Sequence, residues 1–175
     1  FSRLQLNLNA NKMGKIEWER RRREAELLLV FAAAVYALQV RSGRHFLHEH
    51  PAGASSWRHP AIGKLYARPG VDAVVANMCE FGMSTSNSAG GRALAKKPTR
   101  FMSSSAAILS SLSRRCPGGH SHAPLLGGNR ASKAATYPPG LCEAMREVRR
   151  SSSAETIGLA ALGPCRLGAA LESST

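Results

Sequence analysis

The sequence predicts an incomplete α/β domain, in which a mostly parallel sheet is flanked by helices. Two observations lead to this prediction: segments typical of helices and of strands alternate along the chain, and the hydrophobic content of 43% over 175 residues suffices for one core. We expect a disordered N-terminal extension over 1–14, a partial α/β domain over 15–150, and a disordered low-complexity tail over 151–175.

The domain is predicted to begin with a long helix over 15–41. This segment contains no Gly or Pro and is rich in Glu, Arg, Ala and Leu, which are good helix formers. Four apolar residues recur at spacings of three and four, and we expect their face to be buried: Leu27, Phe31, Val35 and Leu38. The basic run 20–23 has acidic residues four positions away, which favours a solvated helix face over a nucleic-acid contact.

The motif-bearing region over 43–150 is predicted to hold the remaining elements. Ser42 and Gly43 end the first helix, and Ser105 is a suitable N-cap for a later one with Ala107, Ile108 and Leu112 buried. In chain order we expect a strand over 44–49, a short helix over 61–67, a strand over 71–75, a flexible loop over 82–97, a strand over 99–102, a helix to about 114, and a last helix from 137 to 150.

The chain is strongly basic. Twenty-four Lys and Arg residues against eleven Asp and Glu residues give a formal charge of +13, so nucleic acid is the natural class of partner. We take Arg100, Arg114 and Arg115 as candidate nucleic-acid contacts. The alternative is that Arg is merely abundant here, because the charge is spread evenly along the chain.

The sequence contains few signals that indicate a cellular location. The chain begins at Phe1 rather than Met and has no secretory signal, so we expect a truncated, intracellular piece, cytoplasmic or nuclear and not secreted. The apolar stretch from Ala25 to Val40 contains Glu26 and Gln39 and is shorter than the roughly 20 residues that span a bilayer. We therefore expect no membrane span.

One group of residues has the chemistry of a metal site. Cys116, His120 and His122 supply one sulfur and two imidazoles within seven residues, and Cys79 is a distant fourth ligand for tetrahedral Zn²⁺. The paired Cys-x-x-Cys arrangement typical of zinc sites is missing, so an ordinary solvated loop is the alternative.

A second candidate site follows the first predicted strand. In that strand His48 and His50 share one face, and Glu49 lies on the other. Catalytic residues of open α/β sheets gather beyond the carboxyl ends of strands, which makes Glu49 and Pro51 candidate catalytic residues. No dinucleotide-binding, phosphate-binding or nucleophile-elbow motif accompanies them.

Short strings in a fixed order also give the chain a family resemblance over residues 43–150. They are His45-Phe46-Leu47-His48-Glu49-His50-Pro51, Ser55-Ser56-Trp57, Cys79-Glu80-Phe81-Gly82, Lys97-Pro98-Thr99-Arg100-Phe101-Met102, Arg114-Arg115-Cys116, Gly119-His120-Ser121-His122, Leu125-Leu126-Gly127-Gly128 and Ala135-Thr136-Tyr137-Pro138-Pro139-Gly140-Leu141-Cys142. This region resembles retrotransposon-like, mobile-element polyproteins of protists and fungi. Met78 and the pair Ser103-Ser104 depart from that pattern, which suggests a decaying copy.

The Glu-His-Pro end of the first predicted strand is also distantly similar to the turn that holds the target base in DNA methyltransferases. This likeness implies that residues 15–115 are the second half of such a domain, with the half that binds the methyl donor upstream.

Three functions follow as hypotheses. The first is a fragment of a mobile-element polyprotein, non-enzymatic alone, that associates with nucleic acid through its charge. The second is a methyltransferase-like nucleic-acid-modifying domain that lacks its donor-binding half. The third is a structural zinc-binding module. The substrate and the oligomeric state do not follow from the sequence.

Overall fold

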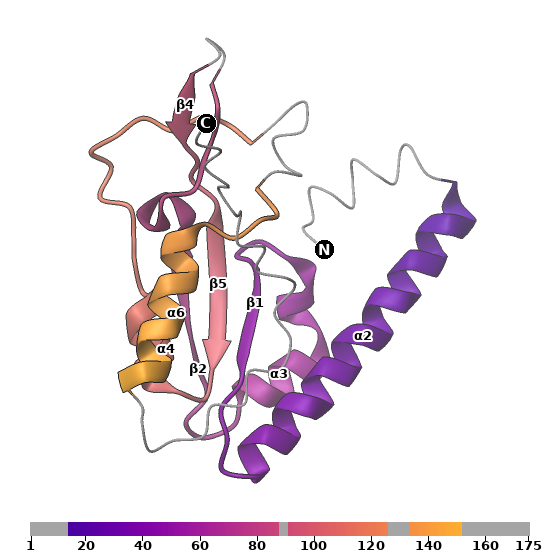
Figure 1. The fold of residues 1–175 in the computed structure, drawn as a ribbon. Helices are drawn as coiled ribbons and strands as arrows, with labels where there is room; N and C mark the ends of the chain where they lie inside the picture. Colours follow the sequence, from indigo (N-terminus) through magenta and orange to yellow (C-terminus); the bar gives the residue numbers. More distant parts are fainter. Residues whose placement is uncertain (1–13, 88–90, 126–133, 152–175) are drawn as a thin grey trace, which may run out of the picture.

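The computed structural model describes residues 14–87, 91–125 and 134–151, which form a three-stranded sheet with helices on both faces (Figure 1). The extension predicted over 1–14 lies outside these residues except for Gly14, which precedes the first helix. The tail predicted over 151–175 lies outside them except for Ser151, the last residue of the last helix.

The described elements follow the predicted order closely. They are α2 (Lys15–Arg41), β1 (Leu47–Pro51), the 3-10 turn η1 (Ser55–Arg58), α3 (Pro60–Tyr66), β2 (Asp72–Asn77), the 3-10 turn η2 (Met78–Phe81), β3 (Ser84–Ser86), β4 (Arg92–Leu94), β5 (Pro98–Ser103), α4 (Ala106–Leu112) and α6 (Pro139–Ser151). The predicted flexible loop over 82–97 is wrong in part, because β3 and β4 pair there as an antiparallel ladder.

Two predicted boundary signals are confirmed. Gly43 follows α2 with a φ of 68°, a left-handed conformation that glycine adopts without steric cost. Ser105 caps α4, because its hydroxyl oxygen accepts a hydrogen bond of 3.4 Å from the backbone N–H of Ile108.

The prediction of a mostly parallel sheet is wrong. The strand order is β1-β5-β2, and β5 is antiparallel to both neighbours, with Phe101 facing Glu49 on one side and Val74 on the other. β1 and β2 therefore run in the same direction with α3 in their connection, as the alternation predicts, but they do not pair. Local patterns cannot show that β5, from later in the chain, inserts between them.

The sheet has a hydrophobic core on each face. Helices α4 and α6 cover one face, where Leu112 and Leu141 pack with Phe101 of β5. Helices α2 and α3 lie on the other face (Figure 1), where Tyr36 and Ile62 pack with neighbours that include Met102 of β5. The central strand thus contributes successive residues to opposite cores, as its two-residue period requires.

The predicted buried face of α2 is wrong. Leu27, Phe31 and Leu38 are 68%, 67% and 51% exposed, and Val35 is half-buried. Ala33 and Tyr36 are the buried residues of this helix. Almost every position from 27 to 38 is apolar, so the periodicity does not select one face of the helix.

A similar error affects α4, where Ala107 is exposed and Leu109 is buried beside Ile108 and Leu112. In the part of the chain that the structure describes, no helix is long and apolar enough to cross a membrane.

Candidate metal centre

The first residue of the metal centre is Cys79, in the η2 turn that directly follows β2. This turn ends at Gly82, whose φ of 80° lets the chain reverse toward β3. The Cys79 side chain is buried, with 5% of its surface exposed, and its thiol is free. A buried free thiol at a fixed turn is available as a metal ligand.

The other three residues come from the loop that follows α4. Asn77, the last residue of β2, holds the start of this loop: its side-chain oxygen accepts a hydrogen bond of 3.0 Å from the backbone N–H of Cys116. Its backbone N–H donates a hydrogen bond of 2.9 Å to the carbonyl oxygen of Arg114. The loop is fixed again at Ala123, whose N–H donates to the carbonyl of Leu94 at 2.8 Å.

These contacts bring four ligand atoms together. The sulfur of Cys116 lies 3.6 Å from Nε2 of His120 and 3.5 Å from Nε2 of His122. With the sulfur of Cys79 included, all ligand atoms of the group lie within 4.8 Å of one another. The structure therefore brings together the four residues that the sequence predicted as metal ligands, and the group could hold a metal ion.

The spacing of these atoms matches tetrahedral coordination. Zinc bonds of about 2.3 Å to sulfur and about 2.0 Å to nitrogen at tetrahedral angles give S···N edges of about 3.6 Å. Both S···N distances at Cys116 have this value. The limit of 4.8 Å within which all four ligand atoms lie is about 1 Å more than the S···S edge of about 3.8 Å in a tetrahedral zinc site.

The surroundings of Cys79 and His122 favour the uncharged forms of these two side chains. Burial, together with the neighbouring Cys116, raises the pKa of the Cys79 thiol to about 11. Burial and the nearby His120 and Lys96 lower the pKa of His122. A bound cation reverses the effect on the thiol, because it stabilises the thiolate that coordinates it.

The structure places Glu49 and Pro51 differently from the prediction. β1 is an edge strand of an antiparallel sheet, so the argument from gathered carboxyl ends does not apply. Pro51 accepts a hydrogen bond of 2.9 Å on its carbonyl oxygen from the indole N–H of Trp57. Glu49 accepts one of 2.7 Å from the hydroxyl of Tyr137. A catalytic role for Glu49 and Pro51 stays a prediction.

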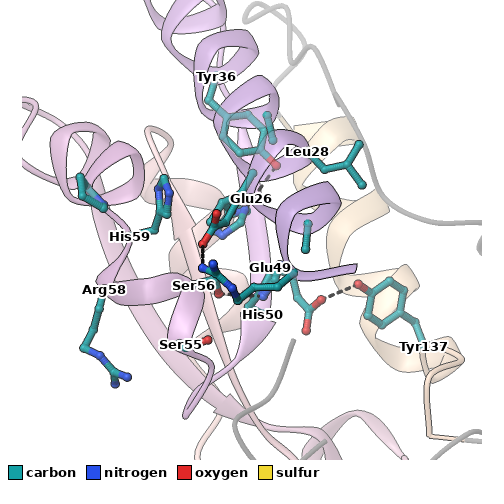
Figure 2. Close-up of a pocket in the computed structure, with 16 residues that line it drawn as sticks. Glu26, Leu28, Tyr36, Glu49, His50, Ser55, Ser56, Arg58, His59 and Tyr137 are labelled. Atoms are coloured by element: carbon teal, nitrogen blue, oxygen red, sulfur yellow. Dashed lines mark hydrogen bonds and ion pairs between the residues drawn. The ribbon is translucent and has the colours of Figure 1, made fainter. Parts of the chain in front are cut away.

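Glu49 lines a cavity of about 700 Å³ between α2 and the β1–η1 segment (Figure 2). The cavity is also lined by His48 and His50, whose stacked rings lie 4.9 Å apart between centroids. Burial lowers the pKa of His48 to about 3 and that of His50 to about 4, so both are neutral near pH 7. Ser56 and Nδ1 of His50 are hydrogen-bonded at 2.9 Å.

The three candidate nucleic-acid contacts do not form one cluster. The guanidinium of Arg100 lies 4.7 Å from the ring centre of Trp57 and 5.4 Å from that of Tyr66, beside α3. Arg114 lies over Phe81 of η2 at 4.9 Å, and the exposed Arg115 precedes Cys116. Of these three residues, only Arg114 and Arg115 are next to the metal centre.

Sequence reasoning missed the residues that organise both sites. Asn77 is 39 positions from the Cys116 N–H that it binds, and Tyr137 is 88 positions from Glu49. No short-range pattern contains such a signal.

Comparisons of this chain with protein-family models, with curated proteins and with solved structures gave no match.

Proposed function

We propose that Cys79, Cys116, His120 and His122 bind one zinc ion, and that this chain is a zinc-stabilised module. The observation that supports this proposal is the meeting of two sulfurs and two imidazole nitrogens within 4.8 Å, with S···N distances that fit a tetrahedral zinc site. Sulfur and nitrogen ligands favour zinc over Mg²⁺ or Ca²⁺, which prefer oxygen.

The role of the zinc is structural. Four protein ligands fill a tetrahedral zinc ion and leave no position for a water molecule or a substrate, whereas catalytic zinc sites keep one position open. The ion would join η2, next to the sheet, to a loop that otherwise has few hydrogen bonds to the rest of the chain. Zinc binding is then coupled to the folding of this loop.

The test is a variant that removes two ligands, Cys116→Ser with His120→Ala. The unchanged chain should purify with one zinc per molecule, and the variant should retain none. A chelator should lower the Tm of the unchanged chain toward that of the variant, since zinc at a thousandfold excess over its Kd adds about 4 kcal/mol of stability.

Ser121→Ala is the matched control, because Ser121 is exposed and lies between the two histidine ligands. It should keep the zinc. Zinc binding by the two-ligand variant, or none by the unchanged chain, would refute the proposal.

A second candidate function is association with nucleic acid, which the distribution of charge supports. Residues 42–87 and 91–125 contain ten Lys or Arg residues against three Asp or Glu residues. Among the described side chains, each ion pair that a Lys or Arg forms joins two residues of the same helix, either α2 or α6. The basic side chains around the sheet are thus left without ion-pair partners among the described residues and are available to phosphates.

We expect weak, sequence-tolerant binding whose affinity falls steeply with salt. Changing Arg114 and Arg115 to Ala should reduce the slope of log affinity against log salt by about 1–2, measured by fluorescence anisotropy with a labelled oligonucleotide. Changing Arg20 and Arg21 to Ala removes the same charge but should reduce the slope less, because both pair with Glu17. An affinity for nucleic acid that does not change with salt concentration would contradict this function.

The relation to mobile-element polyproteins and the methyltransferase-like alternative remain hypotheses from the sequence. Nucleic-acid association is compatible with either, and it supports neither over the other.

A further inference from the structure

The cavity between α2 and β1 has two chemically different walls. Its volume of about 700 Å³ is in the range of small-molecule sites. One wall is formed by α2, where the apolar side chains of Ala25, Leu28, Leu29 and Ala32 lie beside the ion-paired Arg22 and Glu26. The opposite wall is polar and carries Glu49, His50 and Ser56, with Tyr137 beside Glu49 (Figure 2). An occupant that fits both walls has an apolar body and one polar end.

The charge of the polar wall decides which polar end fits. Glu49 is a half-buried carboxylate, and no basic side chain pairs with it among the described residues, although the chain has more than twice as many basic as acidic residues. Its Oε2 accepts the Tyr137 hydroxyl hydrogen at 2.7 Å, and its Oε1 has no hydrogen bond to a described side chain. Glu49 is therefore a carboxylate without a basic side-chain partner among the described residues.

The cationic residues around the cavity do not neutralise Glu49. The guanidinium of Arg22 pairs with Glu26 at 2.6 Å, and both line the cavity. The side chain of Arg58 points away from Glu49 in Figure 2. The two imidazoles on the wall, His48 and His50, are buried beside each other and carry no charge near pH 7.

We propose that this cavity binds an organic amine with an apolar body, whose ammonium group pairs with Glu49 and whose hydrocarbon part contacts the α2 wall. Tyr36 and Tyr137 also line the cavity. No residue that lines the cavity belongs to the group Cys79, Cys116, His120 and His122.

Two probes of the same shape and opposite charge test the proposal, 3-phenylpropylamine and 4-phenylbutyrate. Isothermal titration of the full chain should show the amine binding with a submillimolar Kd and the carboxylate not binding. Glu49→Gln removes the charge and keeps the shape, and it should weaken the amine at least about tenfold, as expected for a partly buried charged hydrogen bond.

Two further variants make the result specific. Glu24→Gln changes the charge equally but lies on α2 outside the cavity lining, so it should leave the affinity unchanged. Leu28→Ala shortens the apolar wall at a side chain that is 68% exposed, so it should weaken the amine several-fold without unfolding the chain.

An unchanged circular dichroism spectrum shows that Glu49→Gln is folded. Equal binding of both probes, no binding of the amine at millimolar concentration, or unchanged affinity in folded Glu49→Gln would overturn the proposal.

Discussion

At the scale of single residues, ligand chemistry could be predicted and its organisation could not. Cys116, His120 and His122 are recognisable from residue type and close spacing, and the distant Cys79 joins them in the structure. Asn77 fixes the loop but carries no metal-ligand chemistry of its own, so its sequence position gives no signal. The ligands of such a site can be recognised by residue type, whereas its geometry depends on contacts between residues that are far apart in the sequence.

His48 leads to a prediction about pH. It is 4% exposed, its Nε2 has no hydrogen-bond partner, and its neighbours are Tyr36 from α2, Glu49 and His50 from β1, and Trp57 from η1. Its pKa is about 3 in the folded chain and near 6.5 when unfolded, so the unfolded state binds more protons between these values. The stabilising contribution of neutral His48 is present above pH 6.5 and is lost as pH falls toward 3.

His48→Phe should remove this dependence. Between pH 6.5 and 4.5 the free energy of unfolding of the unchanged chain should fall by up to about 2 kcal/mol more than that of the variant. At pH 7 the stability of the variant should change little, because the unpartnered Nε2 is removed together with the 3.4 Å hydrogen bond between Nδ1 and the Tyr36 hydroxyl. Urea unfolding of both proteins over this pH range is the measurement, and parallel pH curves would contradict the assignment.

At the scale of elements, predictions succeeded where the local signal is strong. The limits of α2 and the cap of α4 at Ser105 follow from helix formers and stop signals. The buried face of α2 could not be predicted, because apolar residues surround the second half of the helix. The β3–β4 pair was missed because each strand has only three residues, and four of the six are polar: Ser84, Thr85, Ser86 and Arg92.

The packing of α6 against η2 gives a prediction at this scale. A Cβ added at Gly140, near the start of α6, would lie 2.7 Å from the carbonyl oxygen of Phe81. Gly140→Ala should therefore lower the free energy of unfolding by about 1–3 kcal/mol, measured by denaturant unfolding. It should also weaken zinc binding, because η2 carries Cys79.

Gly63→Ala is the matched control. Gly63 is exposed within α3, and an added Cβ would have nothing within 4 Å. This change should raise stability by about 0.5–1 kcal/mol, since Ala is the better helix former. If both substitutions have the same effect, the close contact of Gly140 with η2 does not exist in solution.

At the scale of the whole molecule, the alternation of helices and strands predicted a sheet flanked by helices, and this part is confirmed, with helices on both faces. The direction of the strands was wrong, because β5 enters between β1 and β2 from later in the chain. This topology also places the η2 turn, at the end of β2, beside the loop after α4, so the metal centre is a consequence of the fold rather than of one local motif.

The most direct test of this account is X-ray absorption at the zinc edge of the purified full chain. Coordination by Cys79, Cys116, His120 and His122 predicts two sulfur neighbours at about 2.3 Å and two nitrogen neighbours at about 2.0 Å. Protein that carries no zinc after purification with zinc present, or zinc surrounded by oxygen alone, would contradict the assignment of the metal centre.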